Sequence, residues 1–217
     1  MVNAVMTPTK KPRLREKYER DVVPMLMEKF SIKNRLAVPK VEKIVINMGI
    51  GKGKETKEYA DEVAKHLAAL SGQRPVVTRS RLSIAGFKLR EGMKVGLKVT
   101  LRRDRMWEFL DRLISLAIPR LRDFHNLSHQ TFNKRGNYSL GLSKQTVFPK
   151  IDIETVQNVQ GMDVTLVTDS HDDARALAML QALGMPFKGD DVKDTKEAKD
   201  AKRAKRVKEA AEAKEVK

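Results

Sequence analysis

The segment from Gln73 to Arg105, around which the chain is organised, reads QRPVVTRSRLSIAGFKLREGMKVGLKVTLRRDR. It contains two strand signals. The first is the short β-favouring run Pro75-Val-Val-Thr78, and the second is the alternation of polar and apolar residues from Lys94 to Arg102, which is typical of a half-buried strand. The residues between them mix polar and apolar side chains and include two glycines. The pattern predicts a hairpin whose strands are joined by a long cationic loop.

This hairpin is strongly basic. It holds ten Lys or Arg residues and two acids, which accounts for half of the chain's formal net charge of +16. That charge, with a pI near 10.0, favours a polyanionic partner, nucleic acid before an anionic membrane. No run approaches the roughly 20 apolar residues of a membrane-spanning helix, so we expect no membrane partner. The absence of cysteine excludes disulfides, thiolate metal sites and cysteine nucleophiles, and fits an untargeted cytoplasmic protein.

Composition divides the 217 residues into three parts. Residues 1–13 are rich in Thr, Pro and Lys and are expected to form a flexible arm. Residues 14–188 are expected to form a single folded domain. From 189 to 217 the chain is dominated by charged residues and has too few large apolar side chains for a core, which predicts a disordered or solvated helical tail.

Apolar periodicity predicts further helices and strands on either side of the hairpin. Helices are expected over 14–30 with a kink or break at Pro24, over 56–70 ended by Gly72, over 106–117 capped by Asp104 and ended by Pro119, and over 172–183 started by Ser170 with Asp173 and ended by Gly184. Strands are expected over 41–48 and 162–168, with shorter β-like pieces near 138–140 and 146–148. In the first of these strands Ile44, Ile46 and Met48 share one face, opposite Lys43, Val45 and Asn47.

The motifs that could carry catalysis fail on spacing. The glycine-rich turn GIGKGKET at 49–56 lacks the glycine and hydroxyl positions of a phosphate loop and the third glycine of a dinucleotide site. It remains either a flexible turn or a turn whose backbone approaches an RNA phosphate. His66, His125, His129 and His171 lack the partners of a metal site, and no nucleophile elbow is present. We therefore expect no enzyme activity, no cofactor and no metal.

The polar side of the strand at 94–102 is more informative. It carries Lys94, Lys98, Thr100 and Arg102, and cations with small hydroxyls suit the shallow minor groove of RNA, where phosphates and 2′-hydroxyls are accessible. A solvated face is the alternative. Two other functions stay open on residues alone: an RNA-modifying enzyme, which would need the cofactor loop or metal set that is missing, and an assembly factor that binds RNA transiently.

Eight short motifs, spread in order between about 14 and 188, resemble the L-five family of bacterial ribosomal proteins, which bind 5S rRNA. They are VEKIVINMG at 41–49, SGQRP at 71–75, IAGFK at 84–88, KVTLR at 98–102, RMWEF at 105–109, PRLRDF at 119–124, RGNYS at 135–139 and FPKID at 148–152. The resemblance implies an α+β fold, with an antiparallel sheet that has helices on one face and the other face open to RNA. It also implies a structural protein of the large ribosomal subunit in the cytoplasm.

The resemblance further implies a set of partners. These are 5S rRNA and 23S rRNA, P-site tRNA, a small-subunit head protein reached through an intersubunit bridge, and neighbouring proteins of the central protuberance. The residues implied in 5S rRNA binding are Asn47, Met48, Gly49, Gln73, Lys98, Thr100 and Arg102. Those implied in the loop that faces tRNA are Arg79, Arg81, Ser83 and Lys88. The chain departs from the family at His125 and Asn126, where the family usually has Arg and Gly.

Overall fold

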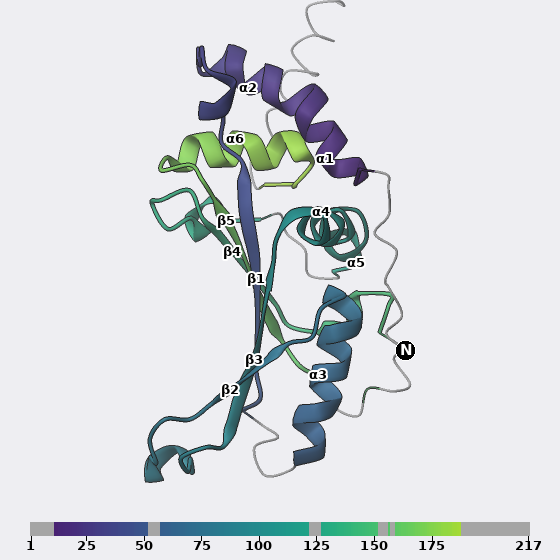
Figure 1. Cartoon of the computed structure of the whole chain (residues 1–217), viewed down its shortest axis with the longest axis vertical. Helices are drawn as coiled ribbons and strands as arrows, with labels where there is room; N and C mark the ends of the chain where they lie inside the picture. Colours follow the sequence, from purple (N-terminus) through teal and green to yellow (C-terminus); the bar gives the residue numbers. More distant parts are fainter. Residues whose placement is uncertain (1–10, 52–56, 122–126, 152–155, 157–158, 188–217) are drawn as a thin grey trace, which may run out of the picture.

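A five-stranded antiparallel sheet forms the centre of the protein in the computed structural model, which describes residues 11–51, 57–121, 127–151, 156 and 159–187 (Figure 1). The strand order is β2-β3-β1-β5-β4, and all four pairings are antiparallel. The strands are β1 Val41–Gly49, β2 Val76–Arg79, β3 Lys94–Leu101, β4 Tyr138–Leu142 and β5 Met162–Thr168. The predicted hairpin is therefore confirmed as β2 and β3, and both strands predicted outside it are confirmed.

The helices lie on one face and at one end of this sheet (Figure 1). They are α1 Arg13–Lys17, α2 Val23–Lys29, α3 Lys57–Ser71, α4 Arg103–Arg112, α5 Ile118–Arg120 and α6 Asp173–Leu183. Single 3₁₀ turns occur at Arg35–Ala37, Ala85–Phe87, His129–Thr131 and Gln145–Val147. The α+β prediction is confirmed, although the β-like piece near 146–148 is wrong, because a 3₁₀ turn occupies that position.

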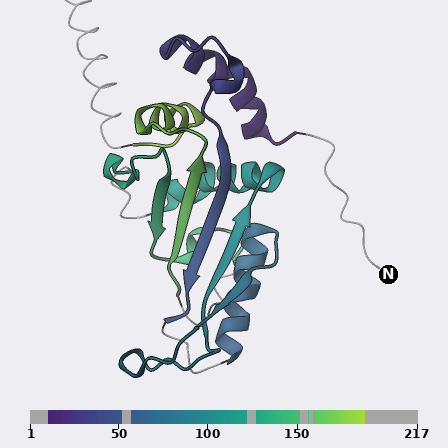
Figure 2. The same ribbon diagram turned by 60° about the vertical axis from the view of Figure 1, so that its left-hand side comes forward.

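The core forms between the sheet and the helices that cover it. On β1 the side chains of Ile44, Ile46 and Met48 are fully buried, and on β3 the same holds for Leu97, Val99 and Leu101. The predicted stripe of α3 (Tyr59, Val63, Leu67, Leu70) is buried against them, as are Phe109 and Leu110 of α4. Since neighbouring residues of a strand point to opposite faces, the residues that alternate with these face away from α3 and α4, namely Val45, Asn47 and Gly49 of β1 and Lys98 and Thr100 of β3. Figure 2 turns this uncovered side of the sheet forward.

Two of the helices are widened into π-helix just before a proline. The π-helical turn Tyr18–Val22 joins α1 to α2 and precedes Pro24, and Leu113–Ala117 joins α4 to α5 and precedes Pro119. A proline has no backbone N–H and its ring meets the carbonyl four residues earlier, which in both helices lies inside the π-helical turn. The helix therefore continues through Pro24, and Pro119 lies inside α5 instead of ending the helix.

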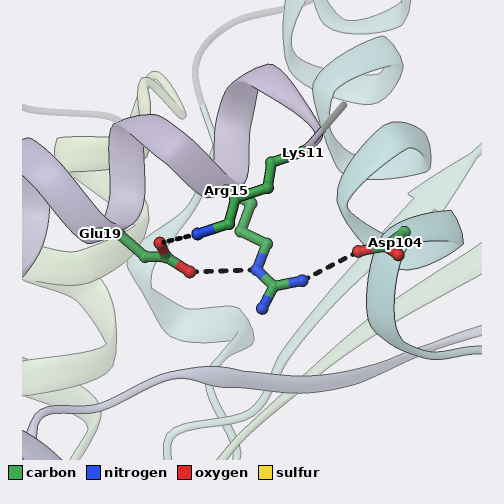
Figure 3. Close-up of polar contacts among 4 residues, drawn as sticks. All are labelled: Lys11, Arg15, Glu19 and Asp104. Atoms are coloured by element: carbon green, nitrogen blue, oxygen red, sulfur yellow. Dashed lines mark hydrogen bonds and ion pairs between the residues drawn. The ribbon is translucent and has the colours of Figure 1, made fainter. Parts of the chain in front are cut away.

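The start of α4 differs from the prediction. The helix begins at Arg103, and Asp104 lies in its first turn, where it accepts a hydrogen bond from Arg15 at 3.0 Å. Arg15 also donates to Glu19 at 3.1 Å, and Lys11 donates to the other oxygen of Glu19 at 3.1 Å (Figure 3). These two cations lower the pKa of Glu19, Lys11 more than Arg15. Of the arm expected over residues 1–13, only 11–13 are described: α1 begins at Arg13, and Lys11 is held by its contact with Glu19.

The ends of the other helices follow simple capping chemistry. Gly72 and Gly184 have φ of 69° and 107°, which confirms both as the left-handed residues that end α3 and α6. The N-cap of α6 is Asp172, whose side chain accepts from the backbone N–H of Ala174 at 3.0 Å. Ser170 instead donates to the carbonyl of Asp172, so its predicted capping role is wrong. Three parts of the predictions lie outside the described residues. They are position 56, where the helix now labelled α3 was expected to begin, the pair His125 and Asn126, and the tail from 189 to 217.

Two glycines allow the core packing to be tested with one matched pair of substitutions. Gly72 and Gly136 have nearly equal φ of 69° and 73°, but an added Cβ has open space at Gly72 and would clash with the carbonyl oxygen of Ser170 at Gly136. We expect Gly72→Ala to cost about 1 kcal/mol of unfolding free energy from the left-handed backbone alone. Gly136→Ala should cost about 1–3 kcal/mol more because of the clash. Urea unfolding of both variants measures the difference, and equal costs would contradict the packing around Gly136.

Candidate nucleic-acid interface

The uncovered face of the sheet is built from rows of residues that the strand register aligns. One row crosses four strands and consists of Thr100, Val45, Thr165 and Ser139. The neighbouring row crosses all five strands and consists of Val76, Lys98, Asn47, Asp163 and Gly141. All nine residues are exposed or half-buried, whereas the residues that alternate with them on β1, β3 and β5 are buried.

The centre of this face is lined by small polar groups. The hydroxyls of Ser139 and Thr165 lie 3.2 Å apart on adjacent strands, and Thr100 adds a third hydroxyl two strands away. Asn47 contributes an amide beside Lys98. Short side chains leave the strand backbones near the surface, so a broad partner can approach closely and exchange hydrogen bonds with these groups. The minor groove of an RNA helix, with its 2′-hydroxyls, is such a partner.

The net positive charge on the open face is lower than the sequence predicts. Lys98 is exposed and makes no ion pair with any other described residue. Arg102, however, donates to Glu42 at 3.0 Å, and this contact holds the pKa of the Glu42 carboxyl below its ordinary value. Asp163 places a negative charge beside Asn47. The face is therefore a hydroxyl and amide surface with few cations.

Lys94 does not belong to this face, contrary to the prediction. The register of β2 and β3 shifts between Thr78 and Arg79, so that Arg79 lies opposite Lys94 instead of Val95. Such a bulge breaks the alternation of the strand. The ammonium of Lys94 reaches the carboxylate of Asp61 on α3 at 2.7 Å and lowers the pKa of that acid. Because α3 covers the other face of the sheet, Lys94 contacts the helices and is not available on the open face.

The structure brings most of the other predicted rRNA-binding residues to one surface. Asn47, Gly49, Lys98 and Thr100 lie on the open face, with Arg102 directly after β3. Gln73 is half-buried in the turn between α3 and β2, where the hydroxyl of Ser71 accepts from its N–H at 3.2 Å and donates to its carbonyl at 2.9 Å. Met48 is the exception, because its side chain is 1% exposed and lies in the core. Its side chain cannot contact a partner on this face.

The long loop between β2 and β3 is folded on itself and extends past the end of the sheet, on the side away from α3 (Figure 1). Ile84 and Leu89 form a β-bridge around the 3₁₀ turn Ala85–Phe87, and Lys88 ends that turn with a φ of 49°. Ser83 accepts from the backbone N–H of Glu91 at 3.0 Å, so it braces the loop. The predicted cations of the loop, Arg79, Arg81 and Lys88, are all exposed. So are Leu82 and Phe87, at 70% and 68%, which gives the tip an apolar surface that charge counting missed.

Comparison with known proteins decides the family. Residues 34–90 match the family model for ribosomal protein L5, and residues 94–187 match the model for the C-terminus of the same ribosomal family. Large ribosomal subunit protein uL5 of Caldanaerobacter subterraneus is 52% identical over 175 residues, covering 81% of this chain and 98% of that protein. The uL5 proteins of Syntrophomonas wolfei and of a Roseiflexus species are 51% and 50% identical, and the matches cover 81% and 82% of this chain and 99% and 98% of those proteins. This chain belongs to the ribosomal protein L5 family.

As a member of the L5 family, the protein is a structural, non-enzymatic component of the large ribosomal subunit. The two L5 family models meet in the β2–β3 loop, between residues 90 and 94. The sheet nevertheless mixes both parts, because β3 from the second lies between β2 and β1 from the first. The L5 fold is thus one continuous sheet over the two matched segments.

Two residues of this L5 face were missed from the sequence. Ser139 and Thr165 complete the row that Thr100 begins, on the far side of β1. The signal was present, since Met162, Val164 and Leu166 alternate with Asp163, Thr165 and Val167 in the manner that assigned the faces of β1 and β3. What the sequence does not show is that β4 and β5 pair beside β1, which is needed to align the rows.

The described residues contain neither a candidate metal site nor a candidate membrane-spanning helix. No group of three His, Asp or Glu side chains in this part of the chain is arranged to hold a metal ion, and His125 lies outside it. Within the same residues no helix has the length and apolar character needed to cross a bilayer.

Proposed function

We propose that this L5-family protein binds 5S rRNA across the open face of its sheet and helps attach that RNA to the central protuberance of the large subunit. The observation that carries the proposal is the continuous row Thr100–Val45–Thr165–Ser139, flanked by Asn47 and Lys98, on a face that no described helix covers. In this proposal the segment 14–188 is the RNA-binding domain.

The chemistry of the face favours recognition of RNA shape. Hydroxyls and an amide can donate to and accept from 2′-hydroxyls, whereas a DNA groove offers none at the same positions. No aromatic side chain stands on the open face in either row, so base stacking of the kind used by single-strand binders is not its mode. Phosphate contacts then come from Lys98 and from cations at the ends of the sheet.

The β2–β3 loop serves a second partner in this proposal, the tRNA of the P site. Its exposed cations Arg79, Arg81 and Lys88 and its apolar tip extend past the end of the sheet, where they can reach a partner that the face does not touch. The proposal also includes contacts with 23S rRNA, with a small-subunit head protein across an intersubunit bridge, and with neighbouring proteins of the central protuberance. These three contacts rest on family membership.

Lys98 and Lys94 provide a matched test of the face, because they lie on one strand and only Lys98 is on the open side. Lys98→Gln should weaken 5S rRNA binding and lower the slope of log affinity against log salt by about one, as expected for one lost phosphate contact. Lys94→Gln should leave both unchanged. Gel-shift titrations at several salt concentrations measure the two variants. Equal losses would show that charge alone, and not the face, directs binding.

The hydroxyl of Thr100 can be tested without changing charge or shape. Thr100→Val should weaken 5S rRNA binding by roughly 1–3 kcal/mol, because a partner group in the dry interface would lose its hydrogen bond. Thr100→Ser keeps the hydroxyl and should lose less than the valine variant. Competition with tRNA in the same titration establishes whether the loss is specific to 5S rRNA. An unchanged affinity for the valine variant would remove Thr100 from the interface.

The loop and the face should be separable by substitution. Arg81→Ala removes a cation of the loop and is expected to leave the binding of isolated 5S rRNA nearly intact, since the loop extends beyond the face. Large subunits that carry this variant should bind tRNA in the P site more weakly. Filter binding of 5S rRNA to the free protein and of tRNA to reconstituted ribosomes measures both. A loss of 5S rRNA binding as large as that of Thr100→Val would contradict the division.

A further inference from the structure

The turn Asn133–Asn137, which leads into β4, is fixed by hydrogen bonds from two other elements. The carboxylate of Asp173 on α6 accepts from the backbone N–H groups of Lys134 at 3.0 Å and of Gly136 at 2.6 Å. Thr168 of β5 donates its hydroxyl to the carbonyl of Gly136 at 2.7 Å. Within the turn, the side chain of Asn133 accepts from the N–H groups of Arg135 and Asn137, at 3.0 Å and 3.2 Å. The backbone of the turn is therefore held in one conformation.

This conformation is unfavourable for one of its residues. Lys134 has a φ of 62°, in the left-handed region where glycine is at ease and a lysine is strained. Asp173, which accepts from the N–H of Lys134, holds that strain in place. Strain that the surroundings enforce on an exposed polar residue is typical of a binding site. A glycine would relieve the strain but would remove the cation.

The charges of this turn are directed outward and are not neutralised within the described residues. Lys134 and Arg135 are exposed, and neither forms an ion pair there. Three other cations at this end of the sheet are instead held in ion pairs. The pairs are Lys40 with Asp169 at 3.5 Å, Arg102 with Glu42 at 3.0 Å and Arg175 with Asp172 at 3.6 Å.

The turn lies at the edge of the open face. Ser139, which ends the row of hydroxyls, is two residues beyond Asn137, and the start of β4 is at the end of the sheet opposite the β2–β3 loop. An RNA strand that follows the row from Thr100 to Ser139 would therefore continue onto the turn. No large apolar side chain is exposed among the described residues from 127 to 151. Protein interfaces are usually centred on such anchors, whereas phosphates need only cations and donors, so RNA is the better fit.

We propose that the turn Asn133–Asn137 is a further RNA contact, in which Lys134 and Arg135 bind backbone phosphates of the RNA that the open face holds. The proposal rests on the 5S rRNA binding proposed above and adds a contact at the β4 edge. Asp173 acts as a positioning residue, because it holds the turn that presents the two cations.

The first test uses the strain of Lys134. In the full-length protein, Lys134→Gly should raise or preserve the melting temperature while it weakens 5S rRNA binding about three- to tenfold and lowers the salt slope by about one. Arg135→Gln should weaken binding by a similar factor. Arg105→Gln, on α4 at the covered side of the sheet, is the matched control and should bind as the parent does. Unchanged affinity in both turn variants would overturn the proposal.

The second test separates positioning from net charge. Asp173→Ala removes an acid from a basic protein, so simple electrostatics predicts tighter RNA binding. If the turn must be held in place, Asp173→Ala should instead bind 5S rRNA several-fold more weakly, whereas Asp169→Ala, which removes an acid at the same end without touching the turn, should not. Tighter binding by both alanine variants would contradict the positioning role. The Lys134→Gly measurement decides the contact itself should Asp173→Ala fail to fold.

The outcomes also distinguish this proposal from the one on which it rests. If Lys98→Gln weakens 5S rRNA binding and the turn variants do not, the open face binds RNA and the turn does not. If neither set weakens it, both proposals are wrong. If the turn variants bind 5S rRNA normally but lose a ribosomal protein from reconstituted subunits, the turn is a protein contact and the RNA proposal is overturned.

Discussion

The rest of the structure depends on the position of β1 between β3 and β5, with hydrogen bonds to both. A strand in this position has no free edge, so it can meet a partner only through the residues that alternate on its two faces. One face, with Ile44, Ile46 and Met48, is fully used by the core. The other is not covered by any described helix, and the register of β1 with the neighbouring strands decides which side chains stand together on it. The hydroxyl row is a product of that pairing.

In the proposed binding mode, the distribution of charge on this surface would allow a protein with a net charge of +16 to select among polyanions. Cations placed evenly over the sheet would attract any polyanion, and such attraction carries no shape information. Here the centre of the face is mostly hydroxyl and amide, with Lys98 and Asp163 of opposite charge in one row. Further exposed cations stand at its two ends, in the β2–β3 loop and in the turn before β4. In the proposed binding mode, a ligand spans these ends and fits the centre at once. Hydrogen bonds hold the backbone at both ends, through Ser83 in the loop and Asp173 in the turn, and such preorganisation reduces the entropy lost on binding.

Sequence patterns were reliable wherever they reported a local requirement. The alternation in β3, the apolar stripe of α3 and the left-handed glycines that end α3 and α6 depend on a few neighbouring residues, and all were predicted. The predictions that failed depend mostly on contacts between residues far apart in the sequence. Lys94 left the polar face because of the register shift at Arg79. Asp104 did not cap α4 because the helix already starts at Arg103 and Arg15 binds the carboxylate of Asp104. Met48 was assigned to rRNA binding although its own strand pattern pointed to the core. Ser139 and Thr165 could be placed in the hydroxyl row only once the order of the strands in the sheet was known.

The strand order has a consequence for how the chain folds as it is made. The first two strands in the sequence, β1 and β2, are not neighbours, because β3 lies between them. When only the first 90 residues have emerged from a ribosome, neither strand has its partner, and the apolar face of β1 has no sheet to join. The sheet can close only after residue 101 has appeared, and β1 gains its second neighbour only with residue 168. A nascent chain of this kind stays open for most of its synthesis, when contact with RNA or a chaperone would protect the exposed strand from aggregation.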